Sequence, residues 1–83
     1  MGQVAVTMRI LPETAEGFEE MKAEFLSKLK PYKVSEMDVA FGLKALKATF
    51  IIPDGEGGAD KLEEIAKTIK GVGQVDVEDM DRL

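Results

Sequence analysis

Apolar and polar residues alternate with a period of two in four segments of the chain, which is the pattern of a strand with one buried face. The clearest of these segments are residues 3–10, 43–52 and 73–78. The segment from Tyr32 to Val39 also alternates, but its phase changes near Ser35-Glu36, and we expect a β-bulge there. The pattern therefore predicts four strands, of which the second is irregular.

Two further segments have apolar residues at helical spacing. Thr14 can cap the first helix at its start, and Pro31 ends it. In the second helix, Asp60 and Lys70 lie at the ends that favour their charges, and Gly71 stands where helices often end in a left-handed residue. The apolar stripes are Phe18, Met21, Phe25, Leu26 and Leu29 in the first helix and Leu62, Ile65, Ala66 and Ile69 in the second.

The resulting order of elements is β-α-β-β-α-β, which is typical of ferredoxin-like folds. Right-handed crossover connections would place both helices on one face of a four-stranded antiparallel sheet. We therefore predict an α+β ferredoxin-like sandwich that forms a single domain over residues 1–83. The residues that we expect to meet in one core are Val4, Val6, Phe25, Leu46, Phe50, Ile65 and Val77.

Composition and charge exclude several classes of sites and binding partners. The chain has 83 residues and contains no His, Cys or Trp. Without cysteine it has no disulfide, no Fe–S cluster and no thiolate zinc site, and we expect a cytoplasmic protein. The net charge is −5 and no basic cluster is present, which argues against binding to nucleic acid. The apolar runs are too short to span a membrane, and a basic protein surface is the better-fitting partner.

The open face of the predicted sheet argues against RNA binding as well. RNA-recognition domains of this topology stack bases on aromatic residues of the central strands, and no aromatic residue is expected on this face. The residues expected there are Gln3, Ala5, Thr7, Arg9, Lys47, Thr49, Ile51, Gln74, Asp76 and Glu78.

Two motifs resemble ligand sites but fit them poorly. Gly55-Glu56-Gly57-Gly58 precedes a helix, yet Ala59-Asp60 replaces the Lys-Ser/Thr pair of a phosphate-binding loop, and the nearby carboxylates would repel an anion. The acidic run from Asp76 to Asp81 lacks the Asx-Gly loop of a calcium site. We interpret the first motif as a connection and the second as a solvated acidic face. No catalytic residue, metal or cofactor is therefore predicted.

Two residues are candidates for contact with a partner. Phe41 lies in a tight turn, where an exposed aromatic is costly unless it packs beneath the turn or meets a partner. From the residues alone, both readings of Phe41 remain open. Arg82 is the penultimate residue and lies where the final strand is expected to stop, a position at which an arginine is usually solvated.

Three segments together resemble archaeal elongation factor 1-beta. They are Ala40-Phe41-Gly42-Leu43-Lys44-Ala45-Leu46, Asp54-Gly55-Glu56-Gly57-Gly58, and the stretch from Gly71-Val72 to Asp81-Arg82-Leu83. The same turn and ending are similar to the C-terminal exchange domain of the eukaryotic factor. The resemblance implies a guanine-nucleotide exchange factor for elongation factor 1-alpha, the GTPase that delivers aminoacyl-tRNA. It also implies that the chain performs no covalent chemistry of its own.

The resemblance also implies which residues contact the GTPase. In the eukaryotic branch the penultimate residue is a lysine that reaches toward the Mg²⁺ and phosphate site, and here Arg82 keeps that charge. We expect the free chain to be a monomer that binds neither nucleic acid nor membranes. The implied partner-binding residues are Ala40, Phe41, Gly42, Leu43, Met80, Asp81, Arg82 and Leu83.

Two other functions are compatible with the predicted fold. A ferredoxin-like regulatory domain would bind a small ligand, or oligomerise, through its edge strands and helix faces. An acylphosphatase-like hydrolase has less support, because the chain contains no Asn and so lacks that family's usual water-orienting amide. Stimulated release of GDP from the GTPase would distinguish the exchange factor from both alternatives.

Overall fold

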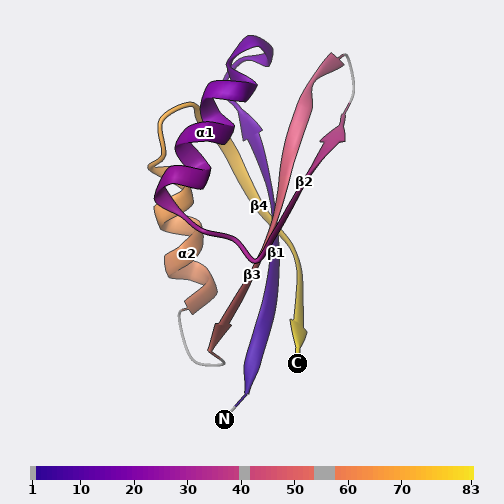
Figure 1. Ribbon diagram of the computed structural model, residues 1–83, viewed down its shortest axis with the longest axis vertical. Coiled ribbons are helices and arrows are strands. Elements are labelled where there is room, and N and C mark those ends of the chain that lie inside the picture. The colour runs from indigo at the N-terminus through magenta and orange to yellow at the C-terminus, as the bar shows by residue number, and fades with distance from the viewer. Residues whose placement is uncertain (1, 40–41, 54–57) are drawn as a thin grey trace.

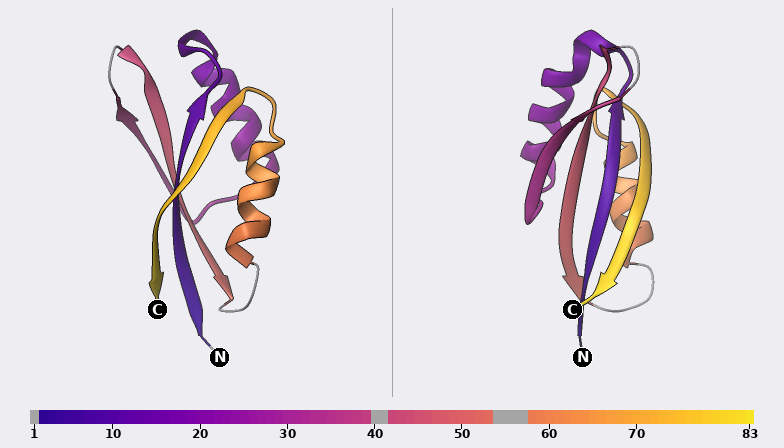
Figure 2. Two further views of the ribbon diagram at one scale, coloured as in Figure 1. Left: turned by 180° about the vertical axis from the view of Figure 1, so that it is seen from behind. Right: turned by 90° about the vertical axis from the view of Figure 1, so that its right-hand side faces the viewer.

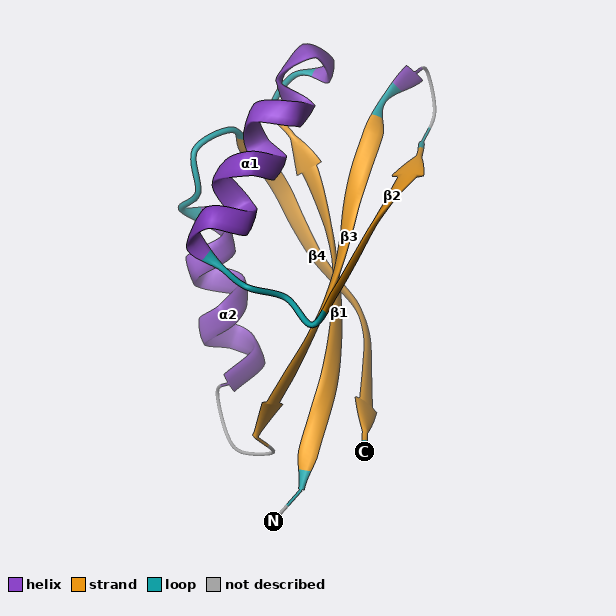
Figure 3. Cartoon of the chain, in the orientation of Figure 1, coloured by secondary structure: helices purple, strands orange, loops and turns teal. Residues whose placement is uncertain are grey.

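Helices and strands follow one another in the predicted order (Figures 1 and 3). The computed structural model describes residues 2–39, 42–53 and 58–83. Its elements are β1 (Gln3–Pro12), the 3₁₀ helix η1 (Ala15–Gly17), α1 (Phe18–Lys28), β2 (Lys33–Asp38), β3 (Lys44–Pro53), α2 (Gly58–Lys67) and β4 (Val72–Arg82). The predicted β-α-β-β-α-β order is confirmed.

The strands form one antiparallel sheet in the order β2-β3-β1-β4. β1 and β3 are central, and β2 and β4 are the edges. Both helices cover the same face of the sheet (Figures 1 and 2), and no described helix covers the other face, which we call the open face. This arrangement confirms the ferredoxin-like α+β sandwich.

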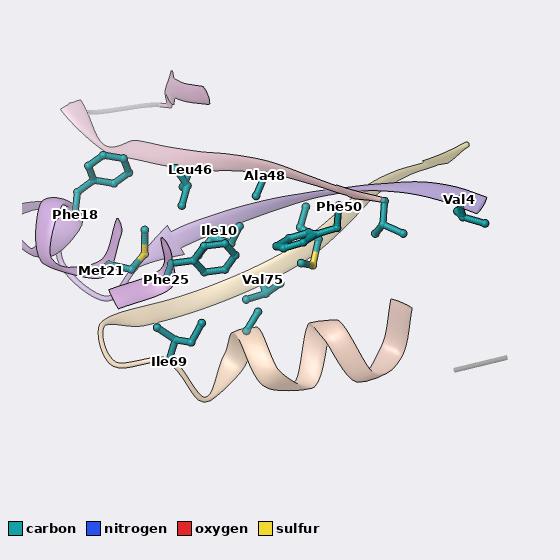
Figure 4. Close-up of a cluster of buried hydrophobic side chains, with 13 residues drawn as sticks. Val4, Ile10, Phe18, Met21, Phe25, Leu46, Ala48, Phe50, Ile69 and Val75 are labelled. Atoms are coloured by element: carbon teal, nitrogen blue, oxygen red, sulfur yellow. The ribbon is translucent and has the colours of Figure 1, made fainter. Parts of the chain in front are cut away.

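The core lies between the sheet and the two helices (Figure 4). The rings of Phe25 on α1 and Phe50 on β3 have centroids 6.1 Å apart and are tilted by 58°, within the range of favourable aromatic pairs. Five residues predicted for the core are buried, namely Val4, Val6, Phe25, Leu46 and Phe50.

Two residues predicted for the core are instead partly exposed. Ile65 is 40% exposed and Val77 is 37% exposed. Leu62 and Ala66 of α2 pack on the core, and so does Ile69, which lies just after α2 ends at Lys67 and not in the helix as predicted. Ile65 lies beside this line because successive helical residues point about 100° apart. Val77 lies on the edge strand β4, where fewer neighbours cover a side chain.

The bulge predicted near Ser35-Glu36 is absent. β2 pairs with β3 over all of Lys33–Asp38 without a shift of register. β2 is an edge strand whose side chains are almost all exposed on both faces. Its polar and apolar residues are therefore not sorted by burial, and a change in their alternation does not indicate a change in pairing.

Gly71 adopts the left-handed conformation that was predicted, but it lies in the turn between α2 and β4 and not directly at the end of α2, which is Lys67. Its φ is 89°, a conformation that costs a residue with a side chain about 1–2 kcal/mol. A Cβ atom at Gly71 would also lie 3.3 Å from the Cβ of Met21.

We therefore expect Gly71→Ala to lower the free energy of unfolding by about 1–2 kcal/mol or slightly more. Gly42→Ala is the matched control, because Gly42 has a φ of 75° but a Cβ there would meet nothing within 4 Å. Urea denaturation of both variants separates the backbone cost from the crowding against Met21. Equal losses would show that Met21 moves aside freely.

Candidate functional site

The turn between β2 and β3 is the first candidate contact region. The backbone N–H of Val39 donates to the carbonyl oxygen of Leu43 at 2.8 Å and closes the hairpin. Gly42 has a positive φ, which a glycine adopts without steric cost, and is exposed. Ala40 and Phe41 lie outside the described residues, so the contact role of Phe41 stays a prediction.

Glu36 of β2 ties this hairpin to the helix layer. One of its carboxylate oxygens accepts a hydrogen bond of 2.5 Å from Nζ of Lys22 on α1, and the other lies 4.0 Å from Nζ of Lys44. The hydrogen bond from Lys22 lowers the pKa of the Glu36 carboxyl, and the same bond raises the pKa of Lys22. Both shifts favour the charged pair in the folded chain.

The lowered pKa of Glu36 predicts an acid-sensitive contribution to stability. The contribution is present above the ordinary pKa of 4.5 and is lost as the pH falls through the lower, folded-state pKa. We expect the stability difference between the parent chain and Glu36→Gln to shrink between about pH 6 and about pH 3. The groups are accessible to solvent, so the effect should be small and weaker in high salt. Thermal melts that show a pH-independent difference would contradict this expectation.

The outer end of β4 is the second candidate region. Arg82 pairs with Val4 of β1, and the N–H of Leu83 donates to the carbonyl oxygen of Gln3 at 2.9 Å. The side chains of Met80 and Leu83 are 54% and 70% exposed. Arg82 also takes part in an interaction within the chain. These residues are therefore held against the sheet while their side chains remain accessible.

A β-bulge determines which face these residues occupy. The register of β4 against β1 shifts at Glu78, which is left as the extra residue. Beyond the bulge, Met80 pairs with Val6 and Arg82 pairs with Val4. Because directly paired residues share a face of the sheet, Met80 and Arg82 lie on the face that carries the helices.

The carboxylates of β4 lie on the open face. Nη2 of Arg9 is 3.4 Å from Oδ2 of Asp76, and Nη1 is 3.9 Å from a carboxylate oxygen of Glu78. Asp79 and Asp81 pair with residues of β1 that also belong to the open face. In the part of the chain that the structure describes, no group of acidic residues is arranged to hold a metal ion.

One flank of the molecule exposes three large apolar side chains. Ile65 belongs to α2, and Val77 and Met80 belong to the helix-side face of β4, against which α2 packs. We call these three residues the α2–β4 flank. The sequence pattern placed Ile65 and Val77 in the core. The position of β4 at the edge of the sheet accounts for the exposure of Val77, whereas no signal in the pattern indicates that of Ile65.

The two candidate regions lie at opposite ends of the sheet (Figure 1). The turn adjoins Lys44 at the start of β3, whereas Arg82 lies beside Val4, which pairs with Ile52 near the end of β3. At the usual rise of a strand, the segment from Lys44 to Ile52 spans about 26 Å. The residues that the resemblance implied as one set therefore form two separate regions.

The remaining features of the described chain add no further candidate. Residues 54–57 of the glycine-rich segment lie outside the described residues, and Gly58 begins α2. A recess of about 370 Å³ near the start of α1 is lined by Glu13, Glu20, Glu24 and Lys70 among others, and includes no residue of either candidate region. Within residues 2–39, 42–53 and 58–83, none of the helices has the length and apolar character needed to cross a membrane.

Comparisons with known proteins identify relatives along the whole chain. The EF-1 guanine nucleotide exchange domain matches residues 5–83. Elongation factor 1-beta of Methanobrevibacter smithii is 38% identical over 88 aligned positions, which cover 100% of this chain and 99% of the relative. Elongation factor 1-beta of Natronomonas pharaonis is 39% identical, with 100% of both chains covered. The protein of that name from Pyrobaculum aerophilum is 37% identical, with 98% of this chain and 95% of the relative covered.

Proposed function

The chain belongs to the EF-1 guanine nucleotide exchange domain family, and we propose that it promotes exchange of GDP for GTP on the GTPase elongation factor 1-alpha. The observation that carries this proposal is the similarity of the entire chain to relatives named elongation factor 1-beta. The family predicted from the sequence is thereby confirmed, and the chain is a translation elongation exchange factor.

Exchange of this kind is a matter of differential binding. The factor must bind the nucleotide-free GTPase more tightly than the GDP-bound form. By linkage, bound GDP lowers the affinity of the GTPase for the factor by the same ratio by which the bound factor lowers its affinity for GDP. A decrease of about 10³ in nucleotide affinity requires about 4 kcal/mol of differential binding. No side chain has to react, which is consistent with a sequence that contains neither His nor Cys.

In this proposal both ends of the sheet contact the GTPase. The turn that contains Phe41 and Gly42 forms one contact, and Met80, Arg82 and Leu83 form the other. Because these ends are about 26 Å apart along β3, the GTPase has to present two separate regions to the chain. The chain acts in the cytoplasm, is a monomer before this encounter and uses no cofactor.

Arg82 is proposed to direct its guanidinium toward the phosphates and the Mg²⁺ of the nucleotide site. Its planar fork can bind two phosphate oxygens at once, whereas the lysine of the eukaryotic branch acts as a point charge. The helix-side face of β4 suits this role, because the residues on it beyond the bulge are Met80 and Arg82 and include no carboxylate.

The proposal is tested by release of fluorescent GDP from elongation factor 1-alpha. A substoichiometric amount of the chain should accelerate release in the presence of excess unlabelled GDP. Titration calorimetry should find tighter binding to the nucleotide-free GTPase than to the GTPase saturated with GDP and Mg²⁺. Equal affinity for both states would refute the proposal, because a factor that binds both equally well cannot change the equilibrium between the GDP-bound and the nucleotide-free GTPase. A regulatory small-ligand domain would leave release unchanged.

A further inference from the structure

The structure indicates from which side the GTPase approaches β4. We infer that the α2–β4 flank, formed by Ile65, Val77 and Met80, docks on elongation factor 1-alpha, and that the open face of the sheet remains outside the contact. This inference rests on the proposed function and deepens it, because it selects one of two faces that both adjoin the outer end of β4.

The first observation is the exposure of apolar side chains. Ile65, Val77 and Met80 are 40%, 37% and 54% exposed, although they lie on elements that pack against each other beside the core. Neighbouring exposed apolar side chains rimmed by polar residues are typical of protein contact surfaces. Methionine in particular adapts its shape to a partner surface.

The second observation is the separation of charges by the bulge at Glu78. Asp76 and Glu78 contact Arg9 on the open face, and Asp79 and Asp81 point to the same side by their pairing with β1. Met80 and Arg82 occupy the opposite face. The single extra residue of the bulge thus places the acidic side chains of β4 on the open face, and the side chains of Met80 and Arg82 on the helix-side face.

Charge complementarity then selects the face. GDP is still bound when the chain first meets the GTPase, and its phosphates would repel the four carboxylates of the open face. The helix-side face of β4 carries no acidic side chain beyond the bulge, and on α2 a carboxylate oxygen of Glu63 lies 3.8 Å from Nζ of Lys67. A bulge that re-aims side chains in this way is a recurrent feature of functional strands.

The test compares the same charge change on the two faces. Met80→Glu adds one negative charge to the flank, and Gln74→Glu adds one to the open face at an exposed position of the same strand. We expect Met80→Glu to weaken binding to nucleotide-free elongation factor 1-alpha by at least about tenfold, as for a residue at the centre of an interface. We expect Gln74→Glu to change it by less than about twofold, as for a charge outside the contact.

A second variant keeps the composition constant. The double variant Asp79→Met with Met80→Asp exchanges two neighbours and leaves Arg82, the net charge and the overall hydrophobicity unchanged. If the flank docks, this exchange should also weaken binding by about tenfold, because it places a carboxylate on the flank. Circular dichroism and thermal melts of each variant establish that the fold is retained, and Ile65→Ser serves as a further flank variant on α2 should a β4 variant not fold.

The outcomes separate the inference from the proposed function. If the parent chain neither binds the GTPase nor accelerates GDP release, the proposed function is wrong and the inference is overturned with it. If the parent chain is active and the folded flank variants bind normally, the proposed function stands and the inference alone is overturned. Loss of binding in Gln74→Glu with normal binding in Met80→Glu would assign the contact to the open face instead.

Discussion

Replacing Phe50 by alanine should lower the free energy of unfolding by about 3–5 kcal/mol. Phe50 is only 6% exposed, and its ring packs with that of Phe25 across the interface between β3 and α1. A domain of this length has a total stability of about 4–12 kcal/mol, so the variant should be close to unfolding at room temperature. Urea denaturation followed by circular dichroism measures the loss directly.

The neighbouring residue provides the control for this prediction. Ile51 lies on the open face of the same strand and is only partly buried. We expect Ile51→Ala to cost about 1 kcal/mol, since it leaves no enclosed cavity. Comparable losses for Phe50→Ala and Ile51→Ala would show that the open face is packed against something in solution and would contradict the assignment of a single core beneath the helices.

The faces of the central strands could be predicted from the sequence, because burial on one side imposes a strict period of two. In β3, Leu46, Ala48 and Phe50 are buried as predicted, while Lys47 is exposed on the other face. The order of elements followed from the same periodicity together with the helical spacing around Phe25. The ferredoxin-like arrangement then required only the usual handedness of the connections.

The edges of the sheet could not be predicted in the same way. On an edge strand neither face is fully covered, so the pattern of β2 suggested a bulge that the pairing does not contain. The bulge in β4 at Glu78 was missed because Glu78 and Asp79 are both acidic and leave no trace in the hydrophobic pattern. The exposure of Ile65 depends on how α2 is rotated about its axis against the sheet. Four apolar residues along one side of a helix do not determine that rotation.

The spatial separation of the two candidate regions was not predicted, although it follows from the antiparallel arrangement of the strands. The resemblance implied one group of residues, from Ala40 to Leu43 and from Met80 to Leu83, without stating how they are placed relative to one another. The antiparallel register puts the turn after β2 at one end of β3 and the outer end of β4 at the other. If both regions contact the GTPase as proposed, two contacts about 26 Å apart would act on different parts of it and could be perturbed independently.

Arg82→Ala should slow the stimulated release of GDP by about 10–100-fold, the equivalent of losing a charge-assisted contact of about 1.5–3 kcal/mol. The side chain would act on the phosphates and Mg²⁺, so the encounter with the GTPase should change much less than the release. Arg82→Lys should retain much of the rate, because it keeps the charge. Stopped-flow measurements at increasing concentrations of the chain separate the two steps.

Substitution of Arg82 is a cleaner test than truncation. Removing Arg82 and Leu83 would also break the pairing with Val4 and the hydrogen bond from Leu83 to Gln3, which contributes about 0.5–1.5 kcal/mol to the folded state. Arg82→Ala leaves the backbone in place. A thermal melt close to that of the parent chain would establish that any change in exchange comes from the side chain.

Magnesium provides the decisive control for Arg82. If the guanidinium competes with Mg²⁺ for the same anionic groups, removing free Mg²⁺ by chelation takes away the competitor, and the defect of Arg82→Ala should shrink. Phe41→Ala, at the other end of the sheet, removes an uncharged side chain that does not compete with Mg²⁺. Any decrease in GDP release that it causes should therefore be the same with and without Mg²⁺. Exchange by Arg82→Ala at the parental rate in millimolar Mg²⁺ would show that the cation has no part in release, and the Phe41-Gly42 turn together with the α2–β4 flank would then have to supply the differential binding.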